Sequence, residues 1–172
     1  MIETTTSIVQ MLITEVKHEA EHTKKILRLV PDDKLTWKPH EKSTALQNLA
    51  QHIAELPGWI EMTINKDQLD FDTDYVPTKK YTSNQELLEI LDIHVNKALE
   101  ALKNATEEIL HKPWTLRKGE QVFFTMPKYQ IIRYMACNHL IHHRAQLGVY
   151  LRLLNIPLPG IYGPTADESR MM

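Results

Sequence analysis

The sequence has one cysteine, Cys137, and five glycines among its 172 residues. It also lacks any apolar run near the roughly 18 residues that a membrane-spanning helix requires. A single cysteine excludes an internal disulfide framework and a zinc finger built from several thiolates. With a hydrophobic fraction of 42%, the chain is not collagen-like or disordered. We therefore expect a globular protein outside the membrane, with one domain over residues 1–172.

Strong charge of either sign is absent as well. Twenty basic and 22 acidic residues give a net charge of -2, and no basic run occurs. Binding to a phosphate backbone needs a clustered positive surface, so nucleic acid is not an expected partner. The first residues show neither a basic segment before an apolar stretch nor a small-residue cleavage site, which argues against a signal or transit peptide. The expected location is the cytoplasm.

Apolar residues recur at helical spacing in four segments, near residues 5–28, 44–65, 83–110 and 127–155. Pro57 lies inside the second segment and predicts a kink there. The pattern predicts an all-α protein with four helices packed as a bundle.

Two long links shape the expected bundle. Residues 66–82 are long enough to recross it, so the second and third helices are predicted to run parallel, in an up-down-down-up order. Residues 111–126 alternate in polarity around Lys118 and Gly119, which indicates a small β-hairpin between the third and fourth helices.

Nine histidines are many for a chain of this length. An α-helix turns about 100° per residue, which places His139, His143 and Gln146 on one inward stripe of the last segment. Two imidazoles four residues apart can reach a single ion. The alternative is that the two histidines are buried without a metal and form hydrogen bonds to neighbouring groups. In that case several ring nitrogens would each need a hydrogen-bond partner.

His52 lies on the inward edge of the second segment. It stands about 18 Å from the end of its helix, and the His139 and His143 pair about 18 to 24 Å from the start of theirs. If the two helices are antiparallel, the three histidines meet at one level. His94 also lies on an apolar stripe at comparable depth and is a weaker candidate for the same site.

The other histidines are expected to be structural or solvated. His18 and His22 are also four residues apart, but they lie among glutamates and away from the apolar stripe of their helix. Cys137 points away from His139, so we do not expect a ligand or nucleophile there. The remaining positions are predicted to serve turns, caps or the surface, namely His40, His111 and His142.

Two stretches resemble a known family. Residues 138–168 contain His-x-x-x-His followed by Arg and, after one residue, Gln, and they end in Tyr-Gly-Pro-Thr-Ala-Asp-Glu. Residues 49–59, LAQHIAELPGW, follow the approach TWKPHEKS. Both are similar to signatures of the DinB/YfiT-like superfamily of four-helix-bundle metal proteins, and the similarity extends loosely over the whole chain.

The resemblance implies a three-histidine site for nickel or zinc at His52, His139 and His143. It also implies a crossover between the second and third helices and a homodimer. Some relatives are transferases that use a low-molecular-weight thiol such as bacillithiol or mycothiol. Others are described as metal-dependent hydrolases.

Three imidazoles leave an open coordination position, which is typical of catalytic metal sites. We therefore expect a metal-dependent enzyme acting on a small molecule, and the resemblance implies, in the first place, a thiol S-transferase with a metal-held thiolate. A hydrolase using metal-bound hydroxide is the alternative. A haem-binding or purely structural bundle is the non-enzymatic one. Gln146 is the candidate for contact with a ligand histidine or substrate, and Arg144 is predicted to pair with Asp167 or Glu168.

Overall fold

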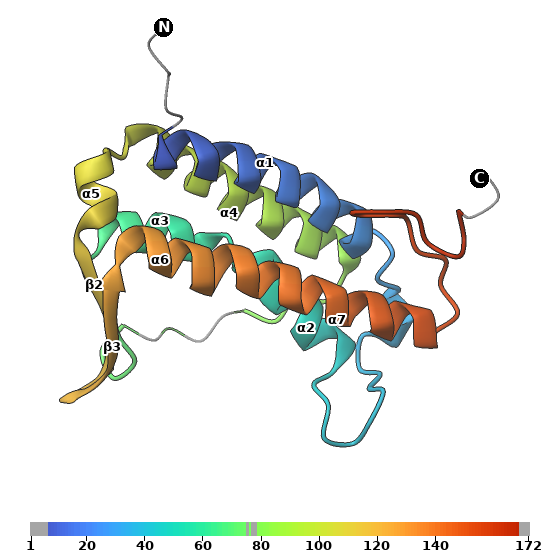
Figure 1. Cartoon of the computed structure of the whole chain (residues 1–172). Helices are drawn as coiled ribbons and strands as arrows, with labels where there is room; N and C mark the ends of the chain where they lie inside the picture. Colours follow the sequence, from blue (N-terminus) through green and yellow to red (C-terminus); the bar gives the residue numbers. More distant parts are fainter. Residues whose placement is uncertain (1–6, 75, 77–78, 169–172) are drawn as a thin grey trace, which may run out of the picture.

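The computed structural model describes residues 7–74, 76 and 79–168, so the first two residues of the predicted first helix lie outside the described part. Each of the four predicted segments forms helix (Figure 1). Within the described residues, no helix is long and apolar enough to cross a membrane. The helices are α1 (Ile8–Leu27), α2 (Leu46–Glu55), α3 (Gly58–Asn65), α4 (Asn84–Asn104), α5 (Glu107–His111), α6 (Lys128–Ile131) and α7 (His139–Leu153).

Pro57 breaks the second segment completely. Helix α2 ends at Glu55 and α3 begins at Gly58, because proline has no N–H to continue the helical hydrogen bonds. Gly58 also lets α3 approach α4 closely, since a Cβ at this position would lie 2.5 Å from Nδ1 of His94. The predicted kink is therefore a helix boundary that fits α3 tightly against α4.

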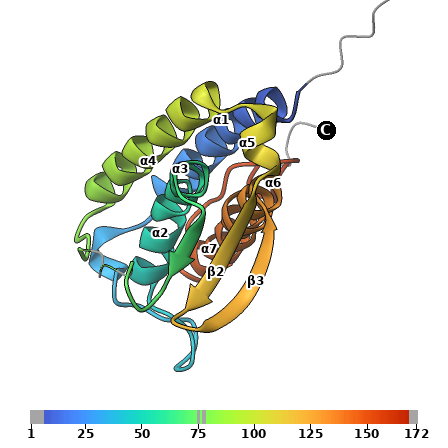
Figure 2. The ribbon, with the colours of Figure 1, turned by 90° about the vertical axis from the view of Figure 1, so that its left-hand side faces the viewer.

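A small sheet lies at one end of the helices (Figure 2). The predicted hairpin is present as β2 (Pro113–Lys118) and β3 (Gln121–Pro127), which pair antiparallel. A third strand, β1 (Gln68–Asp70), pairs parallel with β2 and was not predicted. The all-α prediction is therefore corrected to a mostly helical fold with a three-stranded sheet. A three-residue strand is too short to show an alternating pattern in the sequence.

The last helical segment is not one continuous α-helix. A π-helical stretch, Ile132–Asn138, separates α6 from α7. The buried residues of α7 form one stripe: Leu140, Arg144, Leu147 and Leu151. His139 and His143 lie beside this stripe and are half-buried, so their predicted core position is corrected. The prediction assumed a constant rotation of about 100° per residue over residues 127–155. Because π-helical turns hold more residues than α-helical turns, this assumption misplaces the buried face of the helix.

Lys128, at the start of α6, is buried with 3% of its surface exposed. Its Nζ donates to the backbone carbonyls of Ile64 (3.0 Å) and Lys66 (2.8 Å) at the end of α3. It also forms an ion pair of 2.8 Å with Asp67, which is 83% exposed. The ammonium group thus satisfies carbonyls that the end of α3 leaves without helical partners.

Lys128→Met is expected to lower the free energy of unfolding by about 1.5–3 kcal/mol, the range for hydrogen bonds to a charged group. Methionine keeps most of the apolar stem but removes the donor. Urea denaturation measures the change, with Lys17→Met on the exposed face of α1 as the matched control. Equal denaturation midpoints for the two variants would contradict the role of Lys128.

Candidate metal centre

Three histidines from two helices meet beside the core. His52 comes from α2, and His139 and His143 come from successive turns of α7. Nε2 of His139 lies 3.4 Å from Nε2 of His52 and 2.8 Å from Nε2 of His143. The three rings are half-buried, and their ligand atoms lie within 4.8 Å of one another. The structure therefore brings together the three histidines that the sequence singled out.

The spacing of these nitrogens fits a shared divalent ion. Ligand bonds of about 2.1 Å place neighbouring nitrogens about 3.4 Å apart in a tetrahedron and about 3.0 Å apart in an octahedron. The separation between His52 and His139 matches the tetrahedral value, and that between His139 and His143 is slightly below the octahedral one. Small side-chain rotations suffice to place one ion among all three.

Gln146 sets the orientation of His143. Nδ1 of His143 donates to Oε1 of Gln146 at 2.7 Å, which leaves the Nε2 lone pair free to bind a metal. The amide nitrogen of Gln146 donates to Nε2 of His142 at 3.0 Å. His142, which is exposed as predicted, is therefore linked to the ligand ring of His143 through Gln146.

Two of the three rings, those of His52 and His139, favour their neutral form. Burial, and after it the neighbouring His143 and His139, together lower the pKa of His52 from its ordinary 6.5 to about 4. Burial and then His143 lower the pKa of His139 as well. Nδ1 of His139 is buried and has no hydrogen-bond partner among the described residues. Neutral imidazoles with free lone pairs are the form that binds metals.

The lowered pKa of His52 predicts that the metal-free protein loses stability in acid. Between pH 6.5 and about 4 the unfolded chain binds a proton that folded His52 does not, so the free energy of unfolding falls as pH falls through this window. His52→Gln is expected to flatten this pH dependence. Urea denaturation at several pH values in this range compares the two proteins, and parallel curves would contradict the prediction.

The other sequence candidates lie elsewhere. His94 is outside the three-histidine group, with its Nδ1 buried and facing Gly58. Cys137 is buried among apolar side chains, and burial raises the pKa of its thiol to about 12, so it is no nucleophile. His40 accepts from the backbone N–H of Lys42 in a turn. His111 is the last residue of α5.

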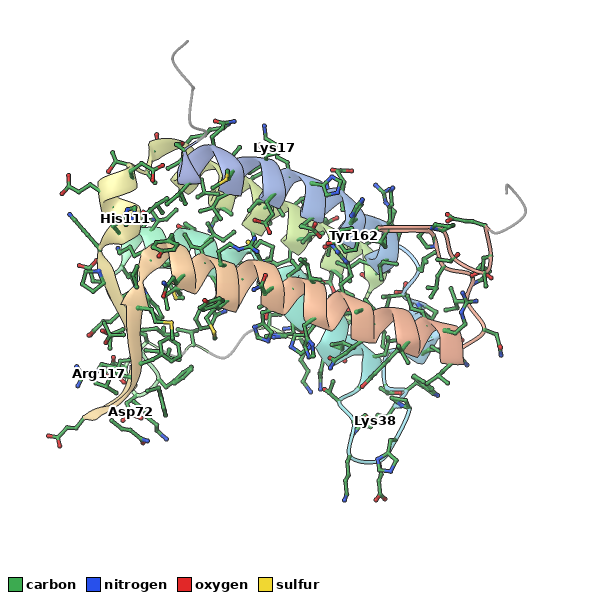
Figure 3. All side chains as sticks on the ribbon, viewed as in Figure 1. Lys17, Lys38, Asp72, His111, Arg117 and Tyr162 are labelled. Carbon is green, nitrogen blue, oxygen red and sulfur yellow. The ribbon has the colours of Figure 1, made fainter. Side chains whose placement is uncertain are left out.

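Arg144 is the centre of a buried network between α7 and α1. The guanidinium is 4% exposed and pairs with the carboxylate of Glu19 at 2.6 Å. It also donates to the hydroxyls of Thr23 (3.2 Å) and Tyr162 (2.8 Å). The Tyr162 hydroxyl donates to Glu19 at 2.7 Å, which holds the C-terminal tail against α1 (Figure 3).

The predicted pairing of Arg144 with Asp167 or Glu168 is therefore wrong. Arg144 belongs to the buried stripe of α7 that faces α1, so its charge is met by a carboxylate of that helix. Arg152, two turns later and more exposed, forms the ion pair with Asp167 instead. An arginine of α7 therefore does pair with Asp167 of the C-terminal segment, but this arginine is Arg152 and not Arg144.

The prediction that His18 and His22 are both solvated is half wrong. His18 is exposed, but His22 is only 8% exposed, and its buried Nδ1 has no hydrogen-bond partner in the part of the chain that the structure describes. Burial, and then His18, lower the pKa of His22. Together with Glu19 these two histidines form a second group of possible metal ligands within 4.8 Å. Glu19 is buried because its carboxylate pairs with the buried guanidinium of Arg144. The spacing of hydrophobic residues in the sequence does not predict that two charged side chains are buried as a pair.

Comparison with known proteins assigns the fold and the family. The chain is 29% identical over 154 residues to the uncharacterized protein YrdA of Bacillus subtilis (strain 168), covering 87% of this chain and 85% of that one. Its structure is similar to a DinB-like protein from Bacillus cereus ATCC 10987, with a TM-score of 0.68 and 22% identity over 88% of this chain and 95% of that one.

A DinB-like protein (YjoA) from Bacillus subtilis gives a TM-score of 0.67 and 18% identity over 94% of this chain and 99% of that one. At these identities the two solved structures support the fold alone. The model of the DinB family matches residues 1–171, nearly the whole chain. The chain therefore belongs to the DinB family.

Proposed function

We propose that His52, His139 and His143 bind one divalent ion, nickel or zinc, and that the protein is a thiol-dependent S-transferase. The observation that carries this proposal is that ligand nitrogens of the three histidines lie within 4.8 Å of one another, with no carboxylate of the described residues in the group. Imidazole ligands suit zinc and nickel alike. A low-molecular-weight thiol is the proposed cosubstrate, and a small electrophile is the proposed substrate.

Each residue has a defined part in this proposal. The bound ion would lower the pKa of the cosubstrate thiol and so supply a thiolate nucleophile. His52 and His139 hold the ion from different helices, and His143 is fixed toward it by Gln146. Because the three rings are half-buried rather than enclosed, the cosubstrate can reach them from solvent.

Two alternatives are less well supported by the geometry. A hydrolase would use the same ion to activate water, but among residues 7–74, 76 and 79–168 no carboxylate joins the three-histidine group to serve as a base. Haem held between two histidines needs its ligand nitrogens about 4 Å apart, on opposite sides of the iron. The Nε2 separations of 3.4 and 2.8 Å at His139 are shorter than that, and the rings of His52 and His143, with centroids 4.8 Å apart, are too close together to lie on opposite faces of a haem.

We propose a single domain over residues 1–172, arranged as an up-down-down-up four-helix bundle, that acts in the cytoplasm as a homodimer. Light scattering tests the oligomeric state of the purified chain.

The test of function begins with metal content. Elemental analysis of tag-free protein, before and after reconstitution with nickel or zinc, is expected to find an ion that needs the three histidines. The loaded protein is then assayed for transfer of bacillithiol, mycothiol or glutathione to a fluorogenic alkylating electrophile. Metal binding without thiol transfer, but with ester or amide hydrolysis, would favour the hydrolase. A protein that takes up no metal would refute both enzymes.

Gln146→Leu is expected to weaken metal binding by about 10- to 100-fold, the usual cost of losing a partner behind a ligand histidine. Leucine keeps the size of the side chain but cannot accept from Nδ1 of His143. Competition with a chromogenic chelator measures the affinity. Gln85→Leu, at an exposed position of α4, is the matched control, and an affinity equal to that of this control would contradict the role of Gln146.

A further inference from the structure

Residues 18–22 of α1 read His-Glu-Ala-Glu-His. This is the H-E-x-x-H pattern, in which two histidines one turn apart on a helix can bind the same zinc ion. The pattern alone is weak evidence, since His18 is exposed and the helix is rich in charge. The three-dimensional arrangement around it adds independent evidence.

The two rings are already close together. Their centroids lie 4.2 Å apart, and one ligand atom each from His18, Glu19 and His22 lie within 4.8 Å of one another. His22 is 8% exposed, and its buried Nδ1 has no hydrogen-bond partner among the described residues. A buried polar atom without a hydrogen-bond partner destabilises the folded chain, and a metal ion bound by the ring would supply the missing interaction.

Glu19 offers one oxygen to this group. Its Oε2 accepts from the Tyr162 hydroxyl and pairs with the Arg144 guanidinium, and one oxygen of the same carboxylate lies within 4.8 Å of a ligand nitrogen of each histidine. Two imidazoles and one carboxylate oxygen form a donor set suited to zinc and other borderline divalent ions. Arg144 already balances the charge of Glu19, so the ion is held chiefly by the two histidines.

We propose that His18, Glu19 and His22 form a second divalent-metal site, for zinc, on α1. It is separate from the three-histidine centre, whose ligands come from α2 and α7. It is a binding site rather than a peptidase centre, because Arg144 and Tyr162 hold the carboxylate that would otherwise serve as the base. The ring of Tyr162 packs edge-on against the ring of His22, with the ring centroids 5.5 Å apart. An ion bound by His22 would therefore fix the orientation of the imidazole against which Tyr162 packs.

Zinc stoichiometry tests this site. The full chain is loaded with zinc alone, dialysed against metal-free buffer and analysed for metal. Wild type is expected to keep two zinc ions and His18→Ala one. His18 is exposed, so its replacement is not expected to disturb the fold, and circular dichroism checks this. His40→Ala, an exposed histidine in a turn, is the matched control and is expected to keep both ions.

The variant His143→Ala separates this site from the proposed centre. If only the α1 site exists, wild type keeps one ion, and His18→Ala loses it. If only the three-histidine centre exists, the single ion is lost in His143→Ala and kept in His18→Ala. The proposal is overturned by that second pattern. It is also overturned if wild type and His18→Ala keep the same number of zinc ions after dialysis.

Discussion

Arg144→Met is expected to lower the free energy of unfolding by about 3–5 kcal/mol, the cost of breaking a buried ion pair by removing one partner. Methionine fills much of the same space but leaves the carboxylate of Glu19 buried without its cation. The Thr23 and Tyr162 hydroxyls lose their guanidinium partner at the same time. Urea denaturation followed by circular dichroism measures the change.

Two further variants test the cause. Arg152→Met removes an exposed ion pair with Asp167 and is expected to cost at most about 1 kcal/mol. Adding Glu19→Gln to Arg144→Met removes the unpaired charge and is expected to restore part of the stability. If Arg144→Met costs no more than Arg152→Met, the buried network does not hold α7 to α1.

The positions of the helices follow from hydrophobic spacing, because each helix buries one side against a shared core. Pro57 and the alternation around Gly119 were local signals, and both the helix break and the hairpin are present. Strand β1 could not be predicted, since its pairing with β2 joins residues 68–70 to residues 115–117 across the chain. Local sequence carries no information on such a partner.

His52, His139 and His143 come together as their spacing predicted, and metal binding by them stays a prediction. His139 and His143 lie within one uninterrupted α-helix. Their spacing is therefore independent of the π-helical stretch before them, although their burial is not. Glu19 and Arg144 were misplaced because a charge pair can lie in a core where hydrophobic spacing predicts solvent. The H-E-x-x-H pattern at residues 18–22 was the signal that could have drawn attention to this region of α1.

His139→Ala is expected to weaken metal binding by more than about 100-fold, beyond the range for loss of a partner behind a ligand. Nε2 of His139 lies between the other two rings, 3.4 Å from His52 and 2.8 Å from His143. Without it, only one imidazole from each helix remains, and two ligands leave a weak, open site. Chelator competition measures the affinity, and any metal-dependent thiol transfer should be lost in parallel.

The neighbouring His142→Ala is the control, since it changes an exposed histidine of the same helix that touches the centre only through Gln146. Both variants should keep the helical fold by circular dichroism, because neither side chain belongs to the buried stripe of α7. Both variants are compared in the His18→Ala background, in which the proposed α1 site holds no ion. If His139→Ala retained the metal and His142→Ala lost it, the ion would be bound by the exposed His142 and not by His139. Metal retained by both would then mean that the three rings are held together by hydrogen bonds rather than by a shared ion.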